Sequence, residues 1–437
     1  MHLRVGALRP SGPRGAPPRR PSVRSERGRV SSDLLHVYDQ WQRGLVEELP
    51  AAINLRHRIH AEPRIAGDEW DTARMVADAL GAVESPSIGG AGRVVRIGPR
   101  HGPAIALRGE LDALPMREET NVPWGSVNGA MHACGHDVHL AALVAVARAA
   151  RSLPLPGGLL AVLQPSEETF PSGARAMLDA GAFDVNDVRA FLGVHLQPRL
   201  AEGVAAATPG PVNASSDEFT IVVDGRGGHA GYPHLTRDPV VALAAIVVAI
   251  QHIVARNVDP TRAAVLTVGT LAAGSAANVV PGRAEARGSL RALHPDDREF
   301  LHRRLVEVAE QVAAAHGCRA QVELTSGEPA LVNDRGLAQA CEPWLAKSGF
   351  VFGEAFRSCG ADDFAHYGEA APTLMVFVGT GDGTHGSPGL HHPRFLPSDL
   401  AVHHVAQAMI AAAVAAFEDL PVPPFGASAG VHARGLG

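Results

Sequence analysis

Cysteine is scarce in this chain, which has four cysteines among 437 residues and no CxxC pair. A small scaffold held together by disulfides is therefore excluded, and so few thiols in a long chain favour a reducing compartment. The first thirty residues are rich in arginine, proline and glycine and lack the apolar segment of a secretory signal. We expect residues 1–32 to be a disordered tail and the protein to be cytoplasmic, with Cys134, Cys318, Cys341 and Cys359 reduced.

The chain also lacks long apolar runs and a net positive charge. The apolar run at Val240–Ile250 has 11 residues, whereas a membrane-spanning helix requires roughly 20. The formal net charge of −6 provides no general attraction for nucleic acid. With 46% hydrophobic and 19% charged residues the composition is globular. We therefore expect neither a membrane nor a nucleic acid as partner.

What the chain does contain is an alternation of strand-like and helical segments. Apolar runs at 104–109, 158–165 and 190–198 alternate with helical patterns, one of which begins at His139. This order predicts an α/β fold with a mostly parallel sheet and helices on both faces. After Val212 the order becomes strand, helix, strand, strand, helix, strand, as in a ferredoxin-like α+β domain. The expected organisation is a main domain from 33–212 and 329–420, an inserted domain from 213–328, and a flexible tail from 421–437.

The segment "MHACGHDVH" concentrates residues that bind metals. Cys134 and His136 are two positions apart on a turn before the expected helix, so both can face one centre. A thiolate can bridge two cations, and imidazole suits the same borderline metals. An alternative is a helix N-terminus capped by Asp137, with histidines that merely line it.

Other ligand types follow the strand-like runs. In open α/β sheets the carboxyl ends of the strands form the ligand crevice, so these side chains are expected to meet there. In the adjacent pair Glu167 and Glu168, one carboxylate can bind metal while the other holds a water and moves its proton. A solvated loop is the alternative reading of that pair. The residues concerned are Glu110, Asp112, Glu167, Glu168, His195, His385, His391 and His392.

Eight motifs in this order resemble the M20 peptidase family. They are "RGELDALPM", "MHACGHDVH", "LQPSEE", "GVHLQP", "GRGGHAGYPHLTRDP", "GSAANVVPG", "CGADDFAHY" and "LHHPRF". The resemblance extends from about residue 50 to residue 415. It is strongest to the branch that cleaves N-acyl amino acids, such as hippurate and auxin-conjugate hydrolases.

The resemblance implies a site with two divalent metal ions per chain, zinc or manganese. Cys134 would be the bridging ligand, and Glu167 the general base and acid. The last ligand would be His391 rather than His392, because the family pattern is Leu-His-x-Pro. Asp112 would support the ligands without binding a metal itself. The remaining ligands would be His136, Glu168 and His195.

The inserted domain corresponds to the family's lid, through which these proteins dimerise. The resemblance therefore implies a homodimer. His229 would reach the reacting carbonyl, across the dimer, and Asn278 would help to bind the substrate carboxylate. Other readings stay open, since His229 lies in a glycine-rich turn and Asn278 could cap a strand.

The sequence departs from the family pattern at three places. Glu110 stands where aspartate is usual, Asp362 where glutamate is usual, and Phe170–Pro171 replaces a glycine-rich stretch. None of these changes removes a ligand. The predicted function is metal-dependent hydrolysis of N-acyl amino acids or similar small amides that carry a carboxylate. A dipeptidase or carboxypeptidase is the alternative enzyme, and a non-catalytic binding homologue is disfavoured by the presence of Glu167.

Overall fold

The computed structural model describes residues 32–381, 387–418 and 420. Residues 1–31 of the predicted tail, the predicted tail 421–437 and His385 lie outside these residues, whereas Ser32 begins a helix. The main domain is built on a seven-stranded sheet with the order β1-β3-β2-β4-β15-β5-β14. The strands are β1 (Arg93–Ile97), β2 (Pro103–Glu110), β3 (Gly158–Gln164), β4 (Asp187–Ala201), β5 (Val204–Ala206), β14 (Val351–Phe352) and β15 (Thr373–Gly381).

The centre of this sheet is parallel, as predicted. Strands β3, β2, β4 and β15 run in the same direction, whereas β1 is antiparallel to β3 and β5 is antiparallel to β15. The short edge strands had no clear alternation in the sequence and were not predicted.

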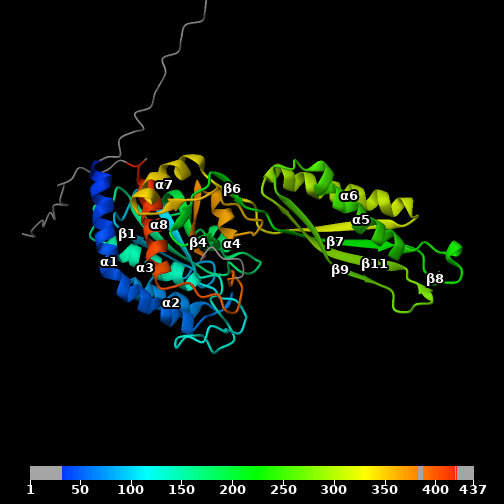
Figure 1. Ribbon diagram of the computed structural model, residues 1–437, viewed down its shortest axis with the longest axis horizontal. Coiled ribbons are helices and arrows are strands. Elements are labelled where there is room, and N and C mark those ends of the chain that lie inside the picture. Colours follow the sequence, from blue (N-terminus) through cyan, green and yellow to red (C-terminus); the bar gives the residue numbers. More distant parts are fainter. Residues whose placement is uncertain (1–31, 382–386, 419, 421–437) are drawn as a thin grey trace, which may run out of the picture.

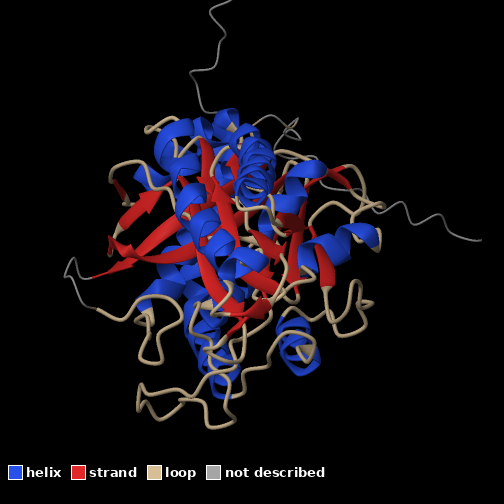
Figure 2. Ribbon diagram, turned by 90° about the vertical axis from the view of Figure 1, so that its right-hand side faces the viewer, coloured by secondary structure: helices blue, strands red, loops and turns tan. Residues whose placement is uncertain are grey.

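Helices cover both faces of the sheet (Figure 2). Successive side chains in the central strands point to opposite sides, so both faces carry apolar side chains that the helices bury. Ile105 and Leu107 belong to the larger core cluster, and Ala104 and Ala106 to the smaller one. The larger cluster includes α1 (Ser32–Ala61), α2 (Trp70–Ala79), α3 (His136–Ala149), α7 (Arg335–Lys347) and α8 (Leu400–Phe417). The smaller cluster includes α4 (Gly173–Asp179) and η2 (Asp363–Glu369).

Helix α3 begins three residues earlier than its sequence pattern indicates. Its N-cap is Gly135, which has a φ of 84° and no side-chain cap. A Cβ atom at Gly135 would lie 2.7 Å from Leu196 Cδ1, so the turn requires glycine. Asp137 does not cap the helix, because its carboxylate binds Arg56 and His60 instead. His136 is therefore fixed on the first turn of a buried helix.

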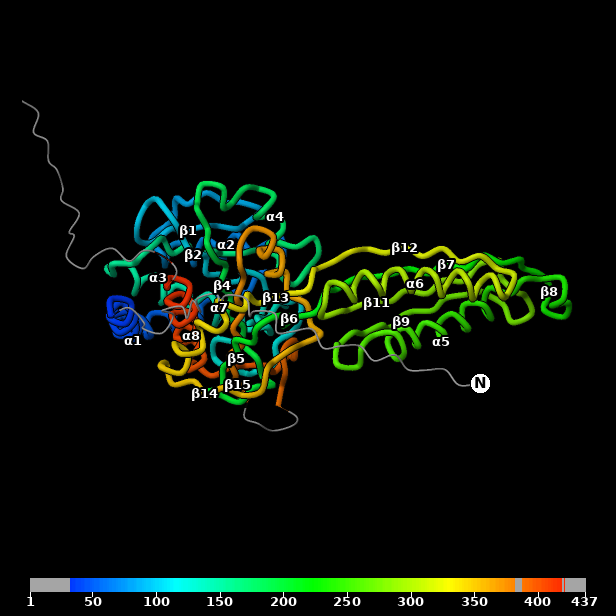
Figure 3. Tube along the Cα trace, turned by 90° about the horizontal axis from the view of Figure 1, so that it is seen from above, coloured from blue at the N-terminus to red at the C-terminus, as the bar shows by residue number. Residues whose placement is uncertain are grey.

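The inserted domain has the ferredoxin-like order, which confirms the predicted fold class. Its sheet has the order β12-β7-β11-β9 with all neighbours antiparallel. The domain projects sideways from the main domain (Figures 1 and 3). Its elements are β7 (Asp217–Asp224), α5 (Pro239–Asn257), β9 (Ala264–Ala273), β11 (Arg283–Ala292), α6 (Pro295–Ala315) and β12 (Arg319–Ser326).

Short elements mark the two ends of the insert. At its base, β6 (Gly210–Asn213) pairs with β13 (Leu331–Asn333). At its far tip, β8 (Gly228–His229) pairs with β10 (Val279–Val280), and η1 (Pro233–Leu235) follows β8. Figure 1 shows β8 at the end of the insert that is remote from the main domain.

Within the described part of the chain, two helices are long and apolar enough to cross a membrane by length and composition alone. In α8 the relevant window is 78% buried, which suits a core helix of the main domain. In α5 it is 33% buried. The sequence did not indicate α5 as a candidate because its uninterrupted apolar run is short, whereas the helix continues through Gln251 to Asn257. The expectation of no membrane partner therefore stays a prediction.

Candidate metal centre and active-site cavity

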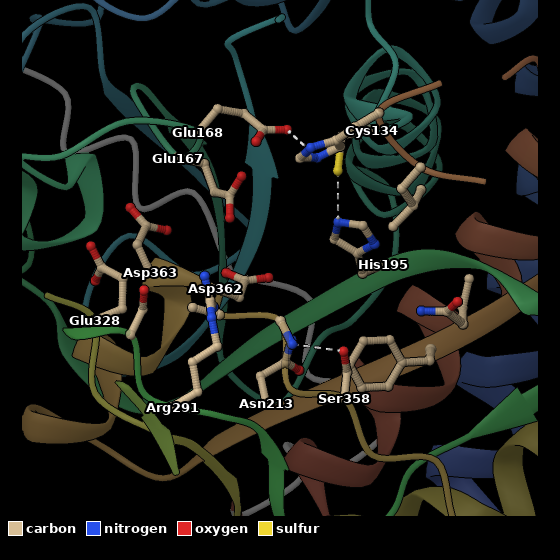
Figure 4. Close-up of a pocket in the computed structure, with 17 residues that line it drawn as sticks. Cys134, Glu167, Glu168, His195, Asn213, Arg291, Glu328, Ser358, Asp362 and Asp363 are labelled. Carbon is tan, nitrogen blue, oxygen red and sulfur yellow. Dashed lines mark hydrogen bonds and ion pairs between the residues drawn. The ribbon is translucent and has the colours of Figure 1, made fainter. Parts of the chain in front are cut away.

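Six of the predicted site residues converge at the carboxyl edge of the parallel strands. They come from the turn before α3, the start of α3, the loop after β3, the middle of β4 and the segment before α8. Figure 4 shows the Cys134 thiol facing His195, with Glu167 and Glu168 on the neighbouring side. The six residues are Cys134, His136, Glu167, Glu168, His195 and His391.

The two buried imidazoles are held with one nitrogen free. His136 Nδ1 lies 2.8 Å from the carbonyl oxygen of Asp112, and His195 Nδ1 lies 2.7 Å from that of Leu196. A carbonyl can only accept, so each Nδ1 carries the proton and each Nε2 presents a lone pair. This is the tautomer that metal-binding histidines require, and the backbone contacts also fix the ring planes.

The spacing of the ligand atoms matches the edges of a coordination polyhedron. Cys134 Sγ lies 3.5 Å from His195 Nε2, and His391 Nε2 lies 3.3 Å from Glu168 Oε1. His136 Nε2 is 4.0 Å from the same Glu168 oxygen. Bonds of about 2.0–2.3 Å around a tetrahedral ion separate adjacent ligand atoms by about 3.3–3.8 Å. These ligand atoms are therefore close enough to one another to coordinate cations.

A buried polar atom without a partner points to the same conclusion. Among the described residues, nothing hydrogen-bonds His136 Nε2, although this atom is buried. Burial raises the pKa of the Cys134 thiol well above its usual range, and Glu168, Glu167 and Glu110 raise it further. A thiolate there needs an adjacent cation, because the cation reverses this effect.

Two ligand triads share one residue. Cys134, His136 and His195 form one triad, and Cys134, Glu168 and His391 form the other. His392 belongs to neither triad, and its Nδ1 accepts from Arg394 N at 3.1 Å. The donors fit two neighbouring divalent ions with Cys134 between them.

Glu167 occupies a different environment from Glu168. Its pKa is raised well above the usual range by burial and by the nearby carboxylates of Asp362, Glu168 and Asp363. Its Oε2 lies 3.8 Å from His136 Nε2, so it borders the ligand cluster. This environment favours the protonated carboxyl, and a carboxyl with a raised pKa beside a ligand cluster is a candidate for an acid–base role.

Asp112 supports the site in two ways. Its backbone oxygen orients His136, and its Oδ2 accepts from the backbone N–H of Glu168 at 2.9 Å. The residue is fully buried. It therefore links the end of β2 to both the helix and the loop that carry ligands.

A cavity of about 490 Å³ opens beside the cluster and extends to the base of the insert. Among the described residues that line it, Arg291 of β11 is the one lysine or arginine. Asn213, Ser358 and Glu328 also line the cavity, and Glu328 pairs with His366 at 2.7 Å. The sequence did not single out these four residues. Only the position of Arg291 near the end of an insert strand could have indicated it.

The structure does not bring His229 or Asn278 to this cavity within one chain. Both are exposed in the β8–β10 tip, where Ala230 N donates to the Asn278 carbonyl at 3.0 Å. That tip lies at the remote end of the insert (Figure 1). A role for either residue at the metal ligands therefore needs a second chain.

Comparison with known proteins places the chain in a family. Residues 106–418 match Peptidase family M20/M25/M40. The N-acetylcysteine deacetylase of Bacillus subtilis is 34% identical over 377 residues, which are 84% of this chain and 97% of that protein. An IAA-amino acid hydrolase (ILR1-like 2) of Arabidopsis thaliana is 34% identical over 80% of this chain and 83% of its own length.

A solved structure agrees with these relatives. The YxeP protein of Bacillus subtilis, described as a dinuclear metal binding peptidase from the M20 family, superposes with a TM-score of 0.74. It is 31% identical, and the match covers 85% of this chain and 99% of that one. The chain belongs to peptidase family M20/M25/M40 and is an enzyme that hydrolyses amides.

Proposed function

We propose that this enzyme hydrolyses N-acyl amino acids, or similar small amides with a free carboxylate, with the help of two divalent ions. The observation that carries the proposal is the sharing of Cys134 by two ligand triads beside Glu167. The names of the deacetylase and the IAA-amino acid hydrolase support a substrate made of an acyl group and an amino acid.

Two divalent ions, when bound, would supply a water of lowered pKa and polarisation of the scissile carbonyl. Glu167 accepts the proton of that water and later donates it to the leaving amine. Asp112 keeps the backbone of Glu168 and the ring of His136 in place while this happens. The residues that would hold the ions are Cys134, His136, His195, Glu168 and His391.

Arg291 is the proposed partner of the substrate carboxylate. It lies on the cavity wall, and its Nη1 donates to the backbone oxygen of Cys359 at 3.3 Å, which restrains the guanidinium. A guanidinium can bind a carboxylate through two parallel hydrogen bonds. The cavity volume also lies in the range of small-molecule sites.

Zinc and manganese are both proposed ions. Thiolate and imidazole favour zinc, whereas the carboxylates also suit manganese.

The insert is proposed to act as a lid and as the interface of a homodimer formed through residues 213–328. His229 would then stabilise the developing oxyanion, and Asn278 would contact the substrate carboxylate, in the cavity of the partner chain. Exposure of both side chains at the remote tip supports this arrangement. The cytoplasm is the proposed location, on the basis of the sequence alone.

A substrate panel tests the proposed function. The full chain is chelated, reloaded with zinc or manganese, and assayed on N-acetyl and N-benzoyl amino acids beside dipeptides with the same C-terminal residue. The proposal predicts metal-dependent release of the amino acid from the acylated substrates. Preferential cleavage of dipeptides would favour the alternative peptidase, and no cleavage of any amide would favour a binding homologue.

A further inference from the structure

His139 is a buried histidine that the proposed mechanism does not use. It is the third histidine of the "MHACGHDVH" segment and is completely buried in the first turn of α3. One nitrogen of its ring, one of His136 and a carboxylate oxygen of Glu110 all lie within 4.8 Å of one another, close enough to hold an ion. Proximity alone therefore allows His139 to be a further ligand.

The hydrogen bonds of His139 exclude that role. Its Nε2 lies 3.1 Å from the backbone nitrogen of Leu196, which can only donate. Nε2 is therefore the acceptor, and the proton of the neutral ring must be on Nδ1. Nδ1 donates in turn to Glu110 Oε2 at 3.1 Å. Both ring nitrogens are engaged, and no lone pair remains for a cation.

Leu196, which is hydrogen-bonded to His139, also orients the ring of the proposed ligand His195. The backbone N–H of Leu196 donates to His139 Nε2, and the carbonyl of the same residue accepts from His195 Nδ1 at 2.7 Å. The two imidazole rings also pack edge to face, with centroids 4.9 Å apart. A shift of His139 would therefore move the backbone that sets the ring plane of His195.

Glu110 holds His139 from the other side. One carboxylate oxygen meets His139, and the other meets Arg108 Nη1. Arg108 is itself buried and anchored by Asp362 at 2.7 Å and Gln164 at 3.1 Å. The longer arm of glutamate, in place of the usual aspartate, lets one side chain reach both Arg108 and His139 in this chain.

We propose that the Glu110–His139 pair is a positioning device that fixes His195 through Leu196 and is not itself a metal ligand. The inference rests on the proposed function only in requiring that His195 binds an ion. Removal of such outer hydrogen bonds typically weakens metal binding about 10- to 100-fold.

Cobalt titration of the chelated full chain tests the proposal. His139→Leu removes both hydrogen bonds, whereas the amide of His139→Gln can accept from Leu196 and donate to Glu110. We expect two cobalt ions per chain in both variants, with one of them bound about 10- to 100-fold more weakly in His139→Leu and within a few-fold of wild type in His139→Gln. The cobalt absorption bands should shift in His139→Leu, because the geometry at His195 changes.

The other outcomes overturn the proposal in different ways. Loss of one cobalt ion from His139→Gln would make His139 a ligand, and wild-type affinity in His139→Leu would leave it without a role. If His139→Leu fails to fold by circular dichroism, Glu110→Leu carries the test, because leucine cannot accept from His139 Nδ1, and we expect the same weakening at one ion. Wild-type protein that binds no cobalt would contradict the proposed function as well, whereas binding that no variant alters would contradict this inference alone.

Discussion

Cys134 Sγ lies 3.5 Å from His195 Nε2, although the two residues are 61 positions apart in the chain. Cys134 belongs to the turn before α3, and His195 lies in the middle of β4. The parallel packing of β2 between β3 and β4 brings that turn over the strand. The same thiol belongs to the triad with Glu168 and His391. One side chain thus connects two groups of ligands, and this sharing is the basis of the predictions that follow.

Glu167→Gln should retain metal and lose most of its turnover. The amide fills the same space but cannot accept a proton, and general-base catalysis contributes roughly a hundredfold or more. Metal analysis and kcat on an N-acetyl amino acid check this result. Turnover like that of the wild type in a metal-loaded Glu167→Gln variant would show that another group moves the proton.

Arg291→Ala should raise KM for carboxylate-bearing substrates by about tenfold or more, since a charge-assisted pair is lost. It should have little effect on the corresponding substrate in which the carboxylate is amidated. Arg287→Ala is a matched control, because Arg287 lies on the same strand but is exposed and pairs with Glu285. Equal effects on both substrates would assign Arg291 a purely structural role.

His229→Ala should lower kcat strongly without loss of metal, since the proposed interaction belongs to the transition state. Mixing this variant with Glu167→Gln should restore activity after subunit exchange, because some mixed dimers combine an intact Glu167 with an intact His229. His234→Ala, a change of another exposed histidine at the tip, serves as the control. No recovery in dimers that have exchanged, or full activity in a monomer, would exclude a role across the dimer.

His60 makes the stability of the main domain depend on pH. Burial alone would lower its pKa, but Asp137 and Glu118 outweigh burial and raise the pKa to about 9. The folded pKa exceeds the unfolded value, so the stabilisation is complete below about pH 6.5 and disappears as pH rises through about 9.

Chemical denaturation of the wild type and His60→Gln over this range measures the effect. The difference between their unfolding free energies should decrease by about 3 kcal/mol from pH 6 to pH 9.5. A constant difference would mean that folding does not change the pKa of His60, and an increasing one that folding favours its neutral form.

The sequence predicted the fold class because its local patterns agree with the final packing. The central strands read as uninterrupted apolar runs, since they are buried on both faces. The start of α3 was misplaced, because a left-handed Gly135 with Leu196 against it is a tertiary feature. Likewise, the Leu-His-x-Pro motif indicated His391 over His392, and the structure places His391 against Glu168.

The roles of other residues depend on orientation, which sequence spacing does not contain. His136 and His139 are three apart on one helix, so a sequence pattern treats them alike. In the structure the Leu196 N–H distinguishes them, since it occupies His139 Nε2, whereas His136 Nε2 has no hydrogen-bond partner among the described residues. Arg291 was missed for a similar reason, because one arginine on a half-exposed strand of the insert resembles the others until the cavity is seen.

The most direct test of the metal-dependent mechanism is the activity of the chelated enzyme on an N-acetyl amino acid as zinc or manganese is added in known molar amounts. Two ligand triads that share Cys134 predict activity that reaches its plateau at two equivalents per chain. Cys134→Ser should then need a large excess of metal, since a hydroxyl is deprotonated less readily than a thiol. Full activity in chelated protein, unchanged by added metal, would contradict the proposed mechanism.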